Sequence, residues 1–278
     1  MLPIMTPRGA AVWVVLALAL AGCGDRHAPR AATPAVVSPA ATPTAAAPLP
    51  AARACVTRGA PFAVARSRVA MTRRSVVTGD RRALDPLVFR PRGGRCARPL
   101  VVFSHGHHGD PASCARICTR LAGAGFVVVA PQHEDRDADR IPLQAGERVD
   151  DVLWVLDHLR APYDRGRIGI AGHSFGGVTA GEAASQDPRL RAVVSLAGTA
   201  GRGTMTATTA PTLIVAGTRD TIETAAASRA SAAAIPETVP HELVVVPGAA
   251  HGDLLDGCGI CGRVESFLTR HLLSRRAA

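Results

Sequence analysis

The sequence predicts an α/β fold, in which a mostly parallel, doubly wound sheet carries helices on both faces. Two observations lead to this prediction. Short, almost continuous apolar runs alternate along the chain with segments of helical spacing, as expected when strands are buried on both faces. Hydrophobic residues make up 47% of the 278 residues and charged residues 19%, which is enough apolar material for a sizeable core.

The predicted elements follow one another along the domain. Short outer strands are expected first, at residues 63–70, 74–77 and 87–91. Buried strands are then expected at 99–104, 126–130, 167–171, 191–197, 211–217 and 242–247, and helices at 112–124, 147–159, from 175 onward, 221–234 and 263–273. Only about a dozen residues connect the strand after residue 191 to the next one, so we expect no lid domain and an open site at the carboxyl ends of the strands.

Residues 172–176, Gly-His-Ser-Phe-Gly, form a G-x-S-x-G motif between a predicted strand and a predicted helix. In that context the motif builds a nucleophile elbow, a turn so tight that its central serine adopts a strained backbone. The hydroxyl of Ser174 would stand above the sheet edge, beside the N–H groups of a helix N-terminus. The same letters also occur as ordinary turns in glycine-rich chains. His173 is expected to pack or hydrogen-bond rather than to catalyse.

Asp220 and His251 are the candidate partners of Ser174. A serine hydroxyl is a poor nucleophile near neutral pH unless a base takes its proton and an acid orients that base. Asp220 follows the strand predicted at 211–217, and His251 follows the last predicted strand. Both side chains should therefore meet Ser174 at one edge of the sheet, as a Ser-His-Asp triad that works through an acyl-enzyme intermediate.

Each partner has an alternative interpretation. Asp220 could instead cap the helix that follows it, with Glu223 as a weaker substitute for the acid. His251 could be a loop histidine with no chemical role. The other candidates for the base are less suitable, because His241 precedes its strand and His271 lies on the closing helix.

Two backbone amides are candidate donors to the oxyanion of a tetrahedral intermediate. One is the N–H of Phe175, directly after Ser174. The other follows His105 and Gly106 in the loop after the strand at 99–104, and we assign it to His107. Preorganised donors of this kind stabilise the charge that develops on the carbonyl oxygen during acyl transfer.

The loop at residues 105–110, His-Gly-His-His-Gly-Asp, also supports a rival interpretation. It partly matches the H-x-H-x-D-H zinc motif of metallo-β-lactamase-type hydrolases. The register fails, because Gly109 stands where an aspartate ligand is needed. A second rival is a non-catalytic protein that binds envelope partners on the same scaffold, since fold alone does not prove activity. We expect no metal and no cofactor.

The N-terminus reads as a lipoprotein signal peptide over residues 1–22. Arg8 gives a short positive region, and residues 11–21 are apolar but too few for a comfortable transmembrane span. Residues 20–23, Leu-Ala-Gly-Cys, resemble a bacterial lipobox, which implies that Cys23 carries lipid. The alternative is an ordinary secretory signal with an incidental cysteine.

The segment at 23–52 is rich in alanine and proline and should form a disordered tether ahead of the domain at 53–278. We therefore expect an exported protein of the bacterial cell envelope, anchored to a membrane through Cys23, periplasmic or on the outer face.

Six cysteines remain after Cys23, and an even number in an exported protein suggests disulfides, although the connectivity stays open. The spacings of 114/118 and 258/261 would also suit zinc. We hypothesise a bond between Cys55 and Cys96, with the other four pairing among themselves. The six disulfide candidates are Cys55, Cys96, Cys114, Cys118, Cys258 and Cys261.

The formal net charge is +10, and apart from histidine every basic residue is arginine. These arginines are scattered and are not interleaved with aromatic residues, which make up only 3% of the chain. We therefore expect no nucleic-acid partner. The expected partners are a small-molecule or polymer-surface ester and, through the lipid anchor, a membrane, with the chain itself a monomer.

Several segments together carry a family resemblance. They resemble the dienelactone-hydrolase-like branch of the α/β-hydrolases and its platelet-activating-factor acetylhydrolase and bacterial cutinase relatives, over about residues 99–275. The resemblance implies an α/β-hydrolase fold and a serine esterase with Ser174 as nucleophile, Asp220 and His251 as its partners, and Phe175 and His107 as oxyanion-hole amides. True dienelactone hydrolases have a cysteine nucleophile where Ser174 stands. The segments are SHGHHG, APQHED, RVDDVLWVLDHL, GHSFGG, LIVAGTRD and GAAHGDLLDGC.

Overall fold

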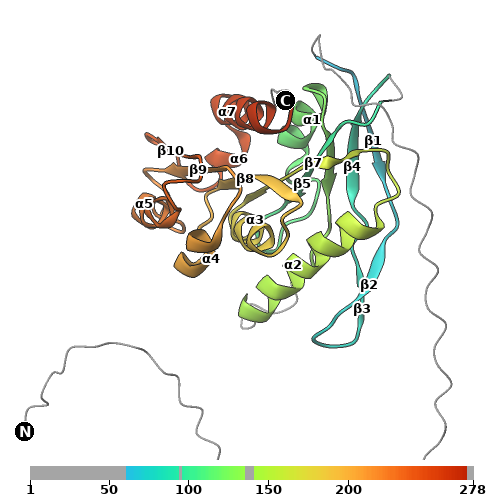
Figure 1. Ribbon diagram of the computed structural model, residues 1–278, viewed down its shortest axis with the longest axis horizontal. Helices are drawn as coiled ribbons and strands as arrows, with labels where there is room; N and C mark the ends of the chain where they lie inside the picture. Colours follow the sequence, from blue (N-terminus) through green and yellow to red (C-terminus); the bar gives the residue numbers. More distant parts are fainter. Residues whose placement is uncertain (1–60, 94–95, 135–140, 274–278) are drawn as a thin grey trace, which may run out of the picture. The chain divides into compact units, whose positions relative to one another are not determined.

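The computed structural model, shown as a ribbon in Figure 1, describes residues 61–93, 96–134 and 141–273. The predicted signal peptide, the tether and the lipidation site at Cys23 lie outside these ranges. No helix within the described ranges combines the length and the apolar character needed to cross a membrane.

An eight-stranded sheet forms the centre of the domain, in the order β1-β4-β6-β5-β7-β8-β9-β10. The pairs β1–β4 and β4–β6 are antiparallel, and the pairs from β6 through β5 to β10 are parallel. The mostly parallel sheet that the sequence predicts is therefore confirmed. Its strands are β1 (Val64–Arg68), β4 (Leu87–Pro91), β5 (Pro99–Ser104), β6 (Val127–Ala130), β7 (Asp164–His173), β8 (Leu190–Leu196), β9 (Thr212–Gly217) and β10 (His241–Val246).

The direction in which strands are added reverses beside β5. After β5 the chain adds β6 on one side, then returns to add β7, β8, β9 and β10 in turn on the other side. In open α/β sheets, ligands bind outside the carboxyl ends of the strands at such a reversal. The candidate site residues follow β5, β7, β9 and β10, so the topology brings all of them to that edge.

Helices cover both faces of the sheet, as Figure 1 shows. Val101 and Phe103 of β5 pack on the side of α1 and α7, whereas Leu100 and Val102 pack on the side of α2 and α3. Burying each large apolar side chain contributes about 1.5–3 kcal/mol, so this alternation fixes which face each strand residue occupies. The helices are α1 (Ala115–Gly123), α2 (Ile141–His158), α3 (Phe175–Gln186), α4 (Arg202–Ala207), α5 (Ala225–Ala234), α6 (Asp253–Asp256) and α7 (Cys258–Leu268), which continues as a π-helical turn at Thr269–Leu273.

A small two-stranded sheet was not predicted correctly. The structure pairs β2 (Thr72–Arg74) with β3 (Arg81–Ala83), whereas the sequence predicts a strand at 74–77. The hydroxyl of Ser75 accepts the backbone N–H groups of Val77 and Thr78 at 3.1 and 2.9 Å, which turns the chain at this point. The apolar residue Val77 is therefore exposed in a turn instead of lying in a strand.

A six-residue helix, α4, lies between β8 and β9, where the sequence predicts no helix. Its residues include glycine and threonine, which have low helix propensity. Met205 is buried among apolar residues that include Ile214 of β9 and Ile235 beyond α5. Tertiary packing therefore stabilises a helix that local propensity does not indicate.

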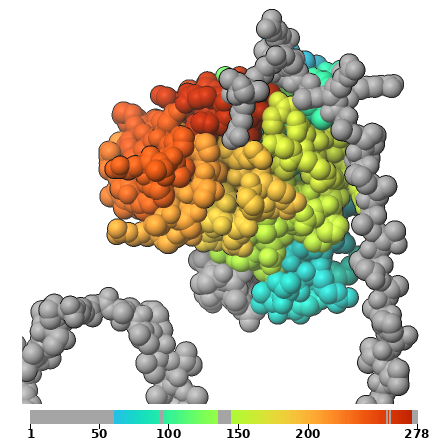
Figure 2. All heavy atoms as spheres, viewed as in Figure 1, coloured from blue at the N-terminus to red at the C-terminus, as the bar shows by residue number. Residues whose placement is uncertain are grey.

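Buried ion pairs attach the β2–β3 hairpin to α2, and Figure 2 shows the two packed together, the hairpin in cyan and α2 in yellow-green. Arg73 Nε donates to Asp151 Oδ1 at 2.6 Å, and Arg82 Nη2 donates to Asp151 Oδ2 at 2.9 Å. Arg73 also pairs with Glu147. Burial alone would raise the pKa of Asp151, but its interactions with His133 and Arg82 lower that pKa to about 2. Asp151 is therefore ionised within the core.

The cysteines differ in part from the prediction. Cys114 and Cys118 are buried free thiols, so the expectation that they pair is wrong. Cys114 is the N-cap of α1 and Cys118 lies one turn into the helix, a spacing that holds Cβ atoms about 5–6 Å apart, so these two cysteines do not bond to each other. Cys96 is disulfide-bonded. Cys55 lies outside the described residues, so its bond to Cys96 stays a prediction.

Candidate active site

Ser174 occupies the tight turn between β7 and α3, as the elbow motif predicts. Its backbone has φ 55° and ψ −125°, a conformation that residues other than glycine rarely adopt. A Cβ atom at Gly172 would overlap the carbonyl oxygen of Gly176, and one at Gly176 would overlap that of Ser104. Glycine is thus required on both sides of the serine, and Ser174 itself remains only half-buried.

Asp220 and His251 form a hydrogen-bonded pair beside this turn. His251 Nδ1 lies 2.8 Å from Asp220 Oδ2, although 31 residues separate the two along the chain. The other carboxylate oxygen, Oδ1, accepts the backbone N–H groups of Ile222 and Glu223, both at 2.9 Å. Burial would raise the pKa of Asp220, but these hydrogen bonds and the one to His251 lower it overall. Asp220 is therefore ionised near neutral pH, and the imidazole must donate through Nδ1.

The alternative role of Asp220 as a helix cap does not fit the structure. Helix α5 begins at Ala225, and its N-cap is Thr224, whose side chain accepts the N–H of Ala227 at 3.2 Å. Asp220 instead stabilises the turn that precedes the helix. Glu223, the weaker substitute, accepts the hydroxyl of Thr199 at 2.7 Å. Of these two acidic side chains, the structure pairs Asp220 with His251.

His173 links the pair to the elbow. Its Nε2 donates to the backbone carbonyl of His251 at 3.0 Å, and the two imidazole rings have centroids 4.9 Å apart. Because His173 directly precedes Ser174, the imidazole of His251 lies at the elbow, with 19% of its side chain exposed. His241, by contrast, begins β10 at the opposite end of the strand, and His271 lies in the closing helical turn.

The two residues proposed to supply the amide donors contact each other through their side chains. The rings of His107 and Phe175 meet edge to face, with centroids 5.5 Å apart. A Cβ atom built at Gly106 would lie 3.5 Å from the Cβ of Ser174, so the backbone of this loop passes directly over the elbow. The structure thus brings the loop after β5 and the start of α3 to the same side of Ser174.

The hydrogen bonds of His105 assign its tautomer. Its Nε2 accepts the backbone N–H of His133 at 3.0 Å, so this nitrogen carries no proton. The proton is on Nδ1, which lies 2.8 Å from the carbonyl oxygen of Gly106. His105 therefore holds the loop in shape. Within the described ranges, His, Cys, Asp and Glu side chains do not gather in threes as a metal site would require.

A second Ser-His-Asp arrangement lies beneath the loop, and the sequence did not reveal it. Ser104 Oγ is 3.0 Å from His133 Nε2, and His133 Nδ1 is 2.9 Å from Asp151 Oδ2. The side chains of His133 and Asp151 are completely buried, as is Ser104, so no substrate can reach this hydroxyl. The weak signals for it are a histidine just after β6 and an aspartate on α2. These three side chains lie under the loop, and His133 is also linked to it through its backbone N–H, which donates to His105.

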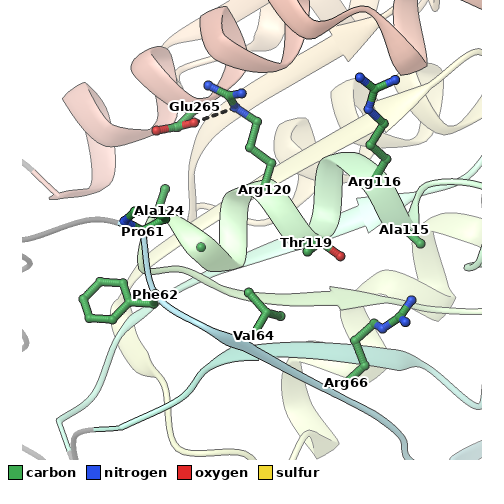
Figure 3. Close-up of a pocket in the computed structure, with 11 residues that line it drawn as sticks. Pro61, Phe62, Val64, Arg66, Ala115, Arg116, Thr119, Arg120, Ala124 and Glu265 are labelled. Atoms are coloured by element: carbon green, nitrogen blue, oxygen red, sulfur yellow. Dashed lines mark hydrogen bonds and ion pairs between the residues drawn. The ribbon is translucent and has the colours of Figure 1, made fainter.

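A cavity of about 810 Å³ lies elsewhere, between β1 and α1. Figure 3 shows Arg66, Arg116 and Arg120 around it, with Arg120 paired to Glu265 of α7 at 2.7 Å. None of the residues that line this cavity belongs to the elbow or to the loops that carry Asp220 and His251. The volume of a cavity therefore does not identify the candidate site in this protein.

Comparison with known proteins finds relatives that are all named as ester hydrolases. Cutinase 1 of Thermobifida cellulosilytica is 29% identical over 162 residues, which is 54% of this chain and 59% of the relative. The bis(hydroxyethyl) terephthalate hydrolase of Streptomyces coelicolor is 34% identical over 128 residues, 44% of this chain and 40% of the relative. The platelet-activating factor acetylhydrolase of Cavia porcellus is 25% identical over 149 residues, 35% and 34% of the two chains. The chain thus spans between a third and three fifths of these relatives.

A solved structure assigned as a dienelactone hydrolase, from Klebsiella pneumoniae subsp. pneumoniae MGH 78578, superposes with a TM-score of 0.61. It is 21% identical and covers 75% of this chain and 100% of its own, which shows a shared α/β-hydrolase fold. The family described as PETase, PET hydrolase-like, matches residues 38–251, a range that includes Ser174, Asp220 and His251. The chain belongs to this PET hydrolase-like family.

Proposed function

We propose that the protein is a carboxylic ester hydrolase that works through a Ser174-His251-Asp220 triad. The observation that carries this proposal is the 2.8 Å hydrogen bond between His251 and Asp220 beside a strained, half-buried serine. An ionised carboxylate on Nδ1 leaves Nε2 of the imidazole as a base. The family membership and the names of the relatives agree with ester hydrolysis.

The proposed reaction begins with proton transfer. His251 Nε2 takes the hydroxyl proton of Ser174 while Oγ attacks the ester carbonyl carbon, and the carbonyl oxygen becomes an oxyanion. The N–H groups of Phe175 and His107 donate to this oxyanion, and each such donor contributes about 2.7–4 kcal/mol in comparable enzymes.

Collapse of the tetrahedral intermediate breaks the bond to the alcohol. The imidazolium of His251 gives its proton to the departing oxygen, and the acyl group stays on Ser174. Water then attacks the acyl-enzyme, again losing a proton to His251, and the carboxylic acid leaves as Oγ recovers its proton. Asp220 stays ionised throughout, because its lowered pKa favours the carboxylate.

We propose small or surface-bound esters as the substrates. The elbow ends at the sheet edge, and the rings of His107 and Phe175 are both partly exposed beside Ser174. Two aromatic rings next to the nucleophile suit an acyl group with a flat or apolar body. The names of the relatives, cutinase and bis(hydroxyethyl) terephthalate hydrolase, point to the same class of ester.

We also propose that the protein is exported and anchored in the cell envelope. The support is the lipobox-like sequence that ends at Cys23 and the tether predicted after it. Metabolic labelling with a fatty-acid probe tests this directly. We expect label on the wild-type chain and none on Cys23→Ala, whereas equal labelling of both chains would contradict the anchor.

A comparison of two serines tests the triad. Ser174→Ala should lower kcat for p-nitrophenyl butyrate by roughly 10⁴-fold or more, because the nucleophile is lost. Ser104→Ala removes a hydroxyl that lies 3.0 Å from His133 Nε2 but is completely buried, so it cannot act as a nucleophile, and we expect its kcat to fall by no more than about tenfold. Full turnover by folded Ser174→Ala would overturn the proposal, and an inactive chain with no serine labelling would favour a non-catalytic envelope protein.

A further inference from the structure

Arg148 of α2 is the largest fully buried side chain among the described residues, with 0% exposed. A guanidinium stays charged in proteins, and a buried charge is unfavourable unless its donors find acceptors. The neighbours of this side chain therefore determine why the fold tolerates it. Those neighbours include the backbone beside the elbow.

Two guanidinium nitrogens of Arg148 donate hydrogen bonds to consecutive carbonyl groups in the loop after β5. Nη1 donates to the carbonyl oxygen of His105 at 2.7 Å, and Nη2 donates to that of Gly106 at 3.1 Å. On its other side, the guanidinium carbon lies 4.6 Å from the centre of the Phe175 ring. One side chain thus contacts both segments that provide the proposed oxyanion donors.

The carbonyl of Gly106 and the N–H of His107 belong to the same peptide unit. That unit is planar and trans, so its C=O and N–H point in opposite directions. A donor that fixes the oxygen therefore also fixes the direction of the N–H. The positive charge of the guanidinium next to this oxygen further polarises the peptide unit and makes its N–H a stronger donor.

We propose that Arg148 is a positioning residue that aims the His107 amide at the reacting carbonyl and holds Phe175 beside it. This inference rests on the proposed function, because it needs an oxyanion to act upon. Arg148 does not itself touch the substrate. It keeps two donors from separate segments in the geometry that a tetrahedral intermediate requires.

The geometry also explains why arginine is needed. Its planar fork presents parallel donors to two acceptors, whereas lysine provides a point charge on a flexible stem. A lysine side chain at position 148 could supply the positive charge, but it could not hold both carbonyl groups in one orientation. A change in arrangement of about 1 Å at a reacting centre is enough to lower a rate by about 10²-fold.

The test compares Arg148→Met, Arg148→Lys and Val152→Ala in the full chain. Val152 lies one turn further along α2 and is completely buried, but no polar contact joins it to the loop, so its variant controls for loss of stability alone. For each folded variant we would measure kcat and KM with p-nitrophenyl butyrate, and the affinity for an alkyl boronic acid, whose adduct with Ser174 is tetrahedral like the intermediate.

We expect Arg148→Met to lower kcat by about 10- to 100-fold with KM changed by less than about threefold, and boronate affinity to fall in the same proportion. Arg148→Lys should lose about 5- to 30-fold in kcat, since charge alone does not aim the amide. Val152→Ala should keep both values within about twofold. Should the methionine variant fail to fold, the lysine variant decides the question by the same two readouts.

The inference is overturned if a folded Arg148 variant keeps wild-type kcat, if kcat falls without loss of boronate affinity, or if Val152→Ala loses as much. Failure of the proposed function has a different signature, because Ser174→Ala would then retain turnover. An inactive Ser174→Ala together with a fully active Arg148→Met would reject only the role of Arg148.

Discussion

The imidazole of His251 and the carboxylate of Asp220 are 2.8 Å apart although they belong to different loops. They meet because β9 and β10 are adjacent and parallel, with Val246 opposite Gly217 at the ends of both strands. Residues that follow neighbouring parallel strands reach the same edge of the sheet. The pairing of these strands thus sets the orientation of the proposed base.

Removing the charge of Asp220 should abolish most of the activity without unfolding the protein. Asp220→Asn keeps an acceptor for the turn at residues 222 and 223 but no longer fixes the tautomer of His251, and kcat should fall by about 10³- to 10⁴-fold. Steady-state kinetics with p-nitrophenyl butyrate measures this. Glu223→Gln is the matched control and should retain kcat within a fewfold range. A larger fall in kcat for Glu223→Gln than for Asp220→Asn would instead assign the acid of the triad to Glu223.

The two elbow glycines should not tolerate a methyl group. Gly176→Ala places a Cβ atom against the carbonyl oxygen of Ser104, so the turn must shift. We expect a loss of stability of at least about 2 kcal/mol and a strong loss of activity, measured by urea unfolding and kinetics. At Gly203 in α4 nothing lies within 4 Å of an added Cβ, and Gly203→Ala should be neutral or stabilising by up to about 1 kcal/mol. Equal effects at both positions would contradict the close packing at the elbow.

Asp151 should make the fold sensitive to acid. Its pKa in the folded state is about 2, below the ordinary value of 3.8, so the carboxylate stabilises the fold above about pH 4 and less as the pH falls toward 2. The difference corresponds to roughly 2 kcal/mol. Urea unfolding of the wild type between pH 6 and pH 2.5 measures this loss.

Asp151→Asn provides the comparison for that measurement. It removes one of the two buried carboxylates that Arg73 and Arg82 share, since Glu147 still pairs with both, and its stability at pH 6 should be lower by about 3 kcal/mol. The part of the acid dependence that comes from residue 151 should also disappear. An identical dependence on pH in both chains would show that the buried carboxylate does not control acid stability.

The sequence was sufficient to predict the sheet and the candidate nucleophile. The run at 99–104 indicates a strand buried on both faces because it is apolar from residue 99 to residue 103 and only its last residue, Ser104, is polar. Asp220 and His251 could be chosen because each follows such a run. The same reasoning missed α4 and the β2–β3 hairpin, where tertiary packing and a single serine hydroxyl determine the backbone.

The support beneath the site could not be predicted from the sequence. Arg148 and Asp151 lie between the regularly spaced apolar residues of α2, so from the sequence they look like part of a solvent-exposed face. In the structure both are completely buried, because the hairpin and the loop after β5 cover that side of the helix. Whether a polar position is covered depends on contacts between residues far apart in the chain, such as Arg73 and Asp151, which are 78 positions apart. Periodicity within one helix carries no information about them.

The proposed reaction requires Ser174 to act as the nucleophile, and labelling with a fluorophosphonate tests this most directly. The full chain would be treated with the reagent, digested, and mapped by peptide mass spectrometry. We predict one adduct per chain, on Ser174, with complete loss of ester hydrolysis and no labelling of His251→Ala. An adduct on Ser104 or any other residue, or full ester turnover by the labelled protein, would contradict the proposed triad.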